Sequence, residues 1–300
     1  MKETTTLPVT LQTLNDDVSL PTRAQIAELL DGLGGDAGLW MTVNRIPYVP
    51  GEYIQVTLAE DGPDLVEHKE FTGDQYGASV DRASVVRLFE AWATEDPEWK
   101  STVSWERTAF TPAPVAAPSF EAVEYATDQA ETWVASGEHS YDEIIEFIME
   151  SAESDDEIDE QQAAVILNPI WMKQVIAQRD WPETTDNDRL TTAFESLGRS
   201  GITARESFAC CMSCGVSEIG GERDDDDTGY VFFHEQDTER AARGDDLMLA
   251  YGAYGGDPKS TIEIGHRIVA AVEASGLTCE WDGSAKSRII IAMNWRKRLV

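Results

Sequence analysis

Alternation of apolar and polar residues marks the first part of the chain as sheet-forming. In residues 52–61, Ile54, Val56 and Leu58 alternate with more polar neighbours. This is the pattern of a strand that buries one face in an antiparallel sheet. Further strand-like runs are GLWMTVNR (38–45), DLVEHKEF (64–71) and STVSWERTAF (101–110). Proline, glycine and aspartate lie between most of these runs, as expected for turns.

Helical spacing appears before the first of these strands and again before the last one. The run TRAQIAELLDGLGG (22–35) begins at Thr22, a typical N-cap residue, and ends in glycines. A second helix is expected from 81 to about 94, with Trp92 on its apolar face. We therefore predict an α+β domain over residues 22–110, an antiparallel meander with a packed helix. The polar residues 1–21 are expected to form a flexible arm.

The second part of the chain has a different pattern. The segment TPAPVAAPS (111–119) is predicted to be an extended Pro/Ala linker. Helical spacing then dominates to about residue 201, and short strand-like runs follow at 202–207, 229–235 and 247–252. We predict that residues 120–300 form a helical segment plus an α/β domain with a mixed sheet.

The charge balance restricts the class of partner. The chain has 56 acidic and 23 basic residues, a formal net charge of −33. The negative electrostatic field of such a chain repels nucleic-acid phosphates and anionic membranes, so we expect neither as a partner. The acidity has two explanations: it keeps the protein soluble, or it attracts a basic protein partner by electrostatic steering. No apolar run approaches the roughly 20 residues that span a bilayer, and no signal-peptide pattern is seen. A cytoplasmic location is expected.

The segment 208-FACCMSCG-215 holds three of the four cysteines. Cys211 and Cys214 have the spacing of a zinc knuckle, but a second C-x-x-C pair is absent. Cys210, His234 or a carboxylate would have to complete the ligand set. Alternatively, the cysteines share one buried helix face as small apolar side chains. A reactive thiolate is disfavoured by the acidic flanking residues. The expected cofactor is therefore Zn²⁺ or none.

A second polar constellation follows the strand at 229–235. A histidine with carboxylates at a strand end can act as an acid–base pair or bind metal. The alternative is that Asp237 or Thr238 caps the next helix. If the strands 229–235 and 247–252 are parallel, His234 and Tyr251 end side by side. The candidate pocket then comprises His234, Gln236, Asp237, Glu239, Tyr251 and Tyr254. The remaining histidines, which look isolated or solvent-facing, are His68, His139 and His266.

Several separated motifs carry a family resemblance. Residues 208–239, the run LMLAYG, the IEIGHRIV helix and the final WDG hairpin resemble a family of uncharacterised actinobacterial proteins known as a domain of unknown function. The resemblance runs from about Leu190 to Trp295 and implies no catalytic residue. The runs EYIQVTLAEDG, LVEHKE and DPEWKSTVSWER resemble small immunity-type domains, which neutralise a toxin by tight binding.

Two functional hypotheses result. The first is a non-enzymatic, immunity-like binding protein whose acidic surface meets a basic protein partner. No Ser-His-Asp order and no H-E-x-x-H motif points to an enzyme, and no catalytic residue is predicted. The second hypothesis is a zinc-binding protein or metal-dependent enzyme that uses Cys211, Cys214 and His234.

Overall fold

The computed structural model describes residues 5–35, 38–71, 74–108, 115, 120–151 and 158–299. The chain divides into two compact units. The first comprises Met1–Ala117 with Leu299–Val300, and the second comprises Pro118–Arg298. The predicted linker, residues 111–119, lies outside the described residues apart from Val115.

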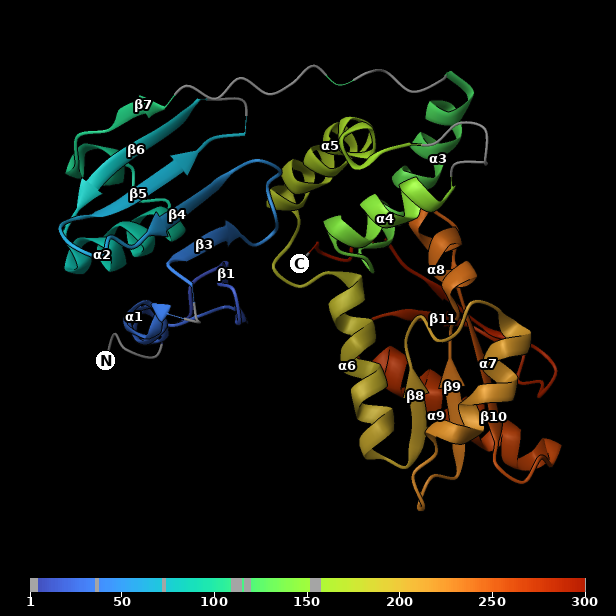
Figure 1. The fold of residues 1–300 in the computed structure, drawn as a ribbon. Helices are drawn as coiled ribbons and strands as arrows, with labels where there is room; N and C mark the ends of the chain where they lie inside the picture. The colour runs from blue at the N-terminus through green and yellow to red at the C-terminus, as the bar shows by residue number, and fades with distance from the viewer. Residues whose placement is uncertain are drawn as a thin grey trace. The chain divides into compact units, whose positions relative to one another are not determined.

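An antiparallel sheet forms the first unit, with the strand order β2-β1-β3-β4-β5-β6-β7 (Figure 1). Its strands are β1 (Val9–Gln12), β2 (Asp17–Ser19), β3 (Trp40–Arg45), β4 (Tyr53–Thr57), β5 (Asp64–Lys69), β6 (Gln75–Val80) and β7 (Glu106–Thr108). The predicted alternation is confirmed in β4, where Ile54 and Val56 are fully buried. Val56 lies opposite Val66 of β5.

Two helices pack on the core of this sheet. Helix α1 (Arg23–Gly32) begins at Thr22, whose side chain accepts a hydrogen bond from the backbone N–H of Gln25. Helix α2 (Arg82–Ala93) places Trp92 in the same apolar core as the buried face of the sheet. The predicted α+β class, an antiparallel meander with a packed helix, is confirmed.

The expectation of a flexible arm over residues 1–21 is wrong for the residues that the structure describes there. Strand β1 pairs with both β2 and β3, and Leu11 lies opposite Val43. Val9 and Leu11 are fully buried. A strand of this length needs few apolar residues to bury one face, because alternate side chains point to solvent. The segment therefore appears polar although it belongs to the sheet.

A mixed sheet forms the centre of the second unit, as predicted, with the strand order β11-β12-β10-β9-β8 (Figure 1). Its strands are β8 (Ile202–Arg205), β9 (Gly229–Phe232), β10 (Leu247–Ala253), β11 (Thr278–Glu280) and β12 (Ile289–Ala292). Strands β8 and β9 are parallel, and the other neighbours are antiparallel.

Among the described residues, four helices flank this sheet: α6 (Asp186–Arg199), α7 (Met212–Glu218), α8 (Glu235–Ala242) and α9 (Pro258–Ala274). They are preceded in the chain by α3 (Phe120–Ser136), α4 (Tyr141–Ser151) and α5 (Glu160–Ala177). Val231 and Phe233 belong to the core that contains α6 and α9, whereas Phe232 belongs to a separate cluster that Met212 of α7 joins. Because side chains alternate along a strand, these two clusters lie on opposite faces of the sheet. Helices α3, α4 and α5 pack together, and α3 also packs against α8.

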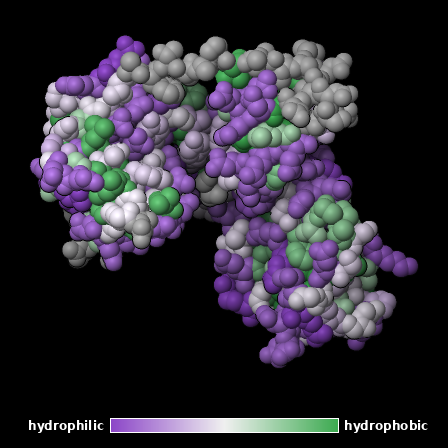
Figure 2. All heavy atoms as spheres, in the orientation of Figure 1, coloured by the Kyte–Doolittle hydropathy of each residue, from purple (hydrophilic) through white to green (hydrophobic). Residues whose placement is uncertain are grey.

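The visible surfaces of both units are mostly hydrophilic, with apolar side chains in small groups (Figure 2). None of the helices in the described ranges combines the length and apolar character that a membrane crossing requires.

Candidate binding pocket and thiol cluster

His234 and Asp237 cap helix α8. The His234 ring accepts a hydrogen bond from the Asp237 backbone N–H through Nδ1, 3.3 Å away. His234 Nε2 lies 3.1 Å from Asp237 Oδ2. Burial lowers the pKa of His234, and the Asp237 carboxylate opposes that shift. The expected helix cap is present, but His234 is the N-cap and Asp237 completes the capping box.

Two arginines complete the surroundings of Asp237, whose side chain is 1% exposed. Arg288 Nη1 donates to Asp237 Oδ1 at 3.0 Å, and Arg288 Nη2 also donates to Oδ2. Arg240 donates to the same carboxylate. A buried carboxylate with such partners is a structural ion network, because its acceptor positions are already used.

The other members of the predicted pocket do not gather around His234. Strand β10 runs antiparallel to β9, not parallel, and Tyr251 lies opposite Val231. Tyr251 donates its hydroxyl to the Ser284 carbonyl, and Gln236 is exposed. The Tyr254 backbone N–H donates to the carbonyl of Thr228, at the start of β9, whereas His234 follows the end of that strand. The antiparallel register therefore separates these side chains.

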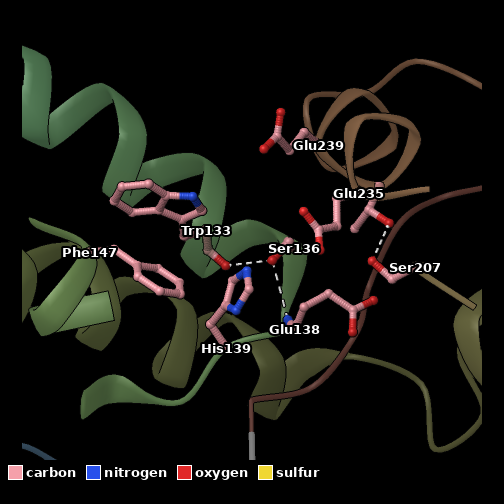
Figure 3. Close-up of a pocket in the computed structure, with 9 residues that line it drawn as sticks. Trp133, Ser136, Glu138, His139, Phe147, Ser207, Glu235 and Glu239 are labelled. Atoms are coloured by element: carbon pink, nitrogen blue, oxygen red, sulfur yellow. Dashed lines mark hydrogen bonds between the residues drawn. The ribbon is translucent and has the colours of Figure 1, made fainter. Parts of the chain in front are cut away.

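A different pocket, of about 300 Å³, lies where α3 and α4 approach α8 and the segment after β8 (Figure 3). Its lining residues are Trp133, Ser136, Glu138, His139, Phe147, Ser207, Glu235, Thr238 and Glu239. Of the predicted pocket residues, this set contains only Glu239. Ser207 and Glu235 follow the carboxyl ends of the parallel strands β8 and β9, where α/β sheets commonly bind ligands.

One wall of the pocket is aromatic. The ring centroids of Trp133 and Phe147 are 5.4 Å apart, and those of His139 and Phe147 are 5.0 Å apart. Figure 3 shows these rings on one side of the pocket and the carboxylates of Glu235 and Glu239 on the other. The two glutamates are four residues apart, so they lie on the same face of α8.

Glu138 supplies a third carboxylate. Its Oε2 accepts a hydrogen bond from Lys297 Nζ at 2.5 Å, and its side chain is 17% exposed. Its Oε1 is buried and has no hydrogen-bond partner among the described residues. Gly137 has a φ of +67° and permits the close passage of the Lys297 backbone, since an added Cβ would lie 2.6 Å from the Lys297 carbonyl oxygen.

Sequence reasoning missed most of this pocket. His139 carries no motif and was expected to be isolated or solvent-facing, but it packs against Phe147. Packing brings α3 to α8 across more than 80 residues of sequence, α4 packs against α3, and no local pattern encodes that approach. The one available signal is the position of Ser207 and Glu235 at the ends of two strand-like runs.

The three clustered cysteines do come together. The Sγ atoms of Cys210, Cys211 and Cys214 all lie within 4.8 Å of one another. Cys210 is exposed, and the other two are partly exposed, so they are not apolar core. His234, the expected additional ligand, does not belong to this group among the described residues. Cys279, in β11, is also a free thiol, and burial raises its pKa to about 11.

The thiols differ in their hydrogen-bond environment. The Cys214 backbone N–H and the Cys214 thiol both lower the pKa of Cys211, with a further contribution from the Ser213 amide. The pKa of Cys214 is raised to about 12, chiefly by its interactions with the thiols of Cys210 and Cys211. Negative charge is therefore more stable on Cys211, the N-cap residue of α7, than on Cys214.

The second unit is thus an α/β domain with a mixed sheet and a pocket beyond the carboxyl ends of its parallel strands. The chain belongs to the family described as Domain of unknown function (DUF6891), whose match covers residues 119–299. The expected resemblance began only at about Leu190, and the family match adds the helices α3, α4 and α5. No curated protein and no solved structure matches the chain.

Proposed function

We propose that this protein is a non-enzymatic binding protein for a basic protein partner, which it contacts through the pocket beside α8. The observation that carries the proposal is the composition of that pocket, in which three glutamates face Trp133 and Phe147. One ammonium group, that of Lys297, pairs with one of the three carboxylates. The pocket therefore has an excess of negative charge.

A lysine or arginine side chain matches this arrangement. Its alkyl stem can pack on the aromatic wall while its charged head meets Glu235 and Glu239. Glu138 Oε1 offers a further acceptor, and an unpaired buried acceptor costs free energy that a donor from a ligand would recover. The net charge of −33 would accelerate the encounter with such a partner.

The likeness of the N-terminal strands to immunity-type domains supports an immunity-like role, with a basic toxin as the partner. The unpaired thiols support a cytoplasmic location, because clustered thiols are typical of reducing compartments. Neither nucleic acid nor an anionic membrane suits a surface of this charge.

Partner capture followed by reconstitution tests the proposal. The full-length protein would be used as bait at about 50 mM and about 500 mM NaCl, and proteins retained only at low salt would be purified and titrated calorimetrically. We expect the E235Q/E239Q variant to weaken binding about tenfold or more. The matched control is E273Q/E280Q, which removes the same charge from exposed positions on α9 and β11.

The comparison of the two variants decides the outcome. A large loss for E235Q/E239Q with a small loss for E273Q/E280Q supports the pocket as the contact. Equal losses would indicate general electrostatic attraction and would contradict a pocket-centred contact. Absence of any basic protein at low salt would contradict the partner itself.

A further inference from the structure

We propose that Cys210, Cys211 and Cys214 form an open three-thiolate site for one thiophilic metal ion of the Zn²⁺ or Cu⁺ class. Their Sγ atoms lie within 4.8 Å of one another. Three sulfurs around a tetrahedral Zn²⁺ are separated by about 3.8 Å, given a Zn–S distance of about 2.3 Å. Small side-chain rotations would therefore close the site.

The backbone explains how two adjacent cysteines can face one ion. In a regular strand, successive side chains point to opposite faces. Here Ala209 has a φ of +60° and Ser207 a φ of +44°, so the chain turns sharply before Cys210. Cys211 is extended and is followed directly by α7, which carries Cys214. Left-handed conformations of residues other than glycine are uncommon and tend to occur at functional sites.

Contacts on both sides of the cysteines hold this arrangement on the sheet. The Phe208 backbone N–H donates to the Phe233 carbonyl at 2.8 Å, and the Glu235 N–H donates to the Ala209 carbonyl at 3.1 Å. Beyond Cys214, Gly215 packs against Phe232, where an added Cβ would lie 2.4 Å from a ring carbon. The thiols are thus positioned in advance, which reduces the cost of ordering them around an ion.

The ligand number indicates the kind of site. The His234 ring already contacts the Asp237 carboxylate. Among the described residues, no carboxylate or histidine lies in the same cluster as the three thiols. Closed structural zinc sites use four protein ligands, whereas three ligands leave one position for water or an incoming group. Thiolates select Zn²⁺ and Cu⁺ over harder ions, and Cu⁺ also accepts three ligands alone. The partial exposure of the thiols gives the ion access.

Titration of the fully reduced, metal-free, full-length protein tests the site. Co²⁺ serves as the optical probe for Zn²⁺, since tetrahedral thiolate coordination gives thiolate-to-cobalt charge-transfer bands, and Zn²⁺ then displaces it. Cu⁺ is titrated separately against a coloured chelator. We expect one equivalent of at least one ion, and at least about tenfold weaker binding in each of C210S, C211S and C214S. The control C279S should bind as the wild type does, and far-UV circular dichroism checks that each variant is folded.

The result is independent of the proposed partner, because E235Q/E239Q retains all three thiols and should bind the ion normally. Stoichiometric binding by the wild type that is lost in folded single-serine variants supports the site. If reduced wild-type protein binds neither Zn²⁺ nor Cu⁺, the site is rejected. Binding that persists unchanged in the three serine variants would place the ion elsewhere and would also reject it.

Discussion

Glu138 and Lys297, 159 residues apart in sequence, form an ion pair in which only one carboxylate oxygen takes part. Lys297 Nζ lies 2.5 Å from Glu138 Oε2, while Glu138 Oε1 is buried and has no partner in the described part of the chain. The pair joins the end of α3 to the C-terminal segment of the second unit. In the proposed function, the second carboxylate oxygen would accept a hydrogen bond from the ligand.

Replacement of Lys297 by methionine tests this pairing. K297M leaves the Glu138 carboxylate largely buried without its cation, so we expect the free energy of unfolding to fall by about 1–3 kcal/mol. The double variant E138Q/K297M should recover part of that loss, since it removes the uncompensated charge. Urea unfolding of the wild type, E138Q, K297M and E138Q/K297M gives the coupling energy. A coupling energy near zero would contradict a significant contribution from the pair.

Asp237 is expected to contribute strongly to stability. D237N weakens the interactions of a carboxylate that is 1% exposed and bound by Arg240, Arg288 and His234. Removal of one member of a buried ion network typically costs roughly 3–5 kcal/mol. E239Q, on an exposed position of the same helix, is the control and should change the unfolding free energy by less than about 0.5 kcal/mol. Similar values for both variants would disprove the structural role of the network.

His68 makes the stability of the first unit depend on pH. It is 2% exposed and packs among Tyr76, Trp99 and Trp105, contrary to the expectation of an isolated or solvent-facing side chain. Burial, assisted by the charge of Lys100, lowers its pKa from 6.5 to about 4. The folded state therefore favours the neutral ring, and the unfolded state takes up the proton first.

The consequence is a loss of stability on acidification. As pH falls from 6.5 to about 4, the unfolding free energy should decrease by roughly 3 kcal/mol through this residue, and the effect should level off below pH 4. H68F should lack this decrease in the unfolding free energy, but it should keep the pH dependence that the carboxylates contribute. Fluorescence-monitored unfolding is suitable, because Trp105 lies 4.5 Å from His68 between ring centroids. Identical pH profiles for both proteins would refute the assignment.

Gly215 determines how closely α7 approaches the sheet. A Cβ at this position would lie 2.4 Å from a Phe232 ring carbon, so G215A should lower the unfolding free energy by about 1–3 kcal/mol. G220A is the matched control, since an added Cβ there meets nothing within 4 Å. Adding F232L to G215A should recover part of the loss. Equal stability of G215A and G220A would show that the helix can shift without cost.

Local patterns predicted much of the fold. The alternation around Ile54 and Val56 predicted β4, and Thr22 predicted the start of α1, because both signals depend on residues close in sequence. Local patterns gave the wrong prediction at Val9 and Leu11, which were expected to lie in a flexible arm. Those residues become buried only because β3, some 30 residues further on, lies beside them.

The candidate sites show the same difference between features encoded by nearby residues and features that depend on distant ones. The spacing of Cys210, Cys211 and Cys214 determined that the thiols can meet, since residues this close are brought together by one turn and one helix. The separation of His234 from Tyr251 was decided by the antiparallel pairing of β9 and β10, which sequence patterns do not specify. The union of Trp133, Glu138 and Glu239 in one pocket likewise depends on the packing of α3 against α8. The sequence by itself therefore determined most of the elements, the net charge and the proximity of the three thiols. Only the tertiary structure decided the strand directions and the pocket, because these result from contacts between residues far apart in the chain.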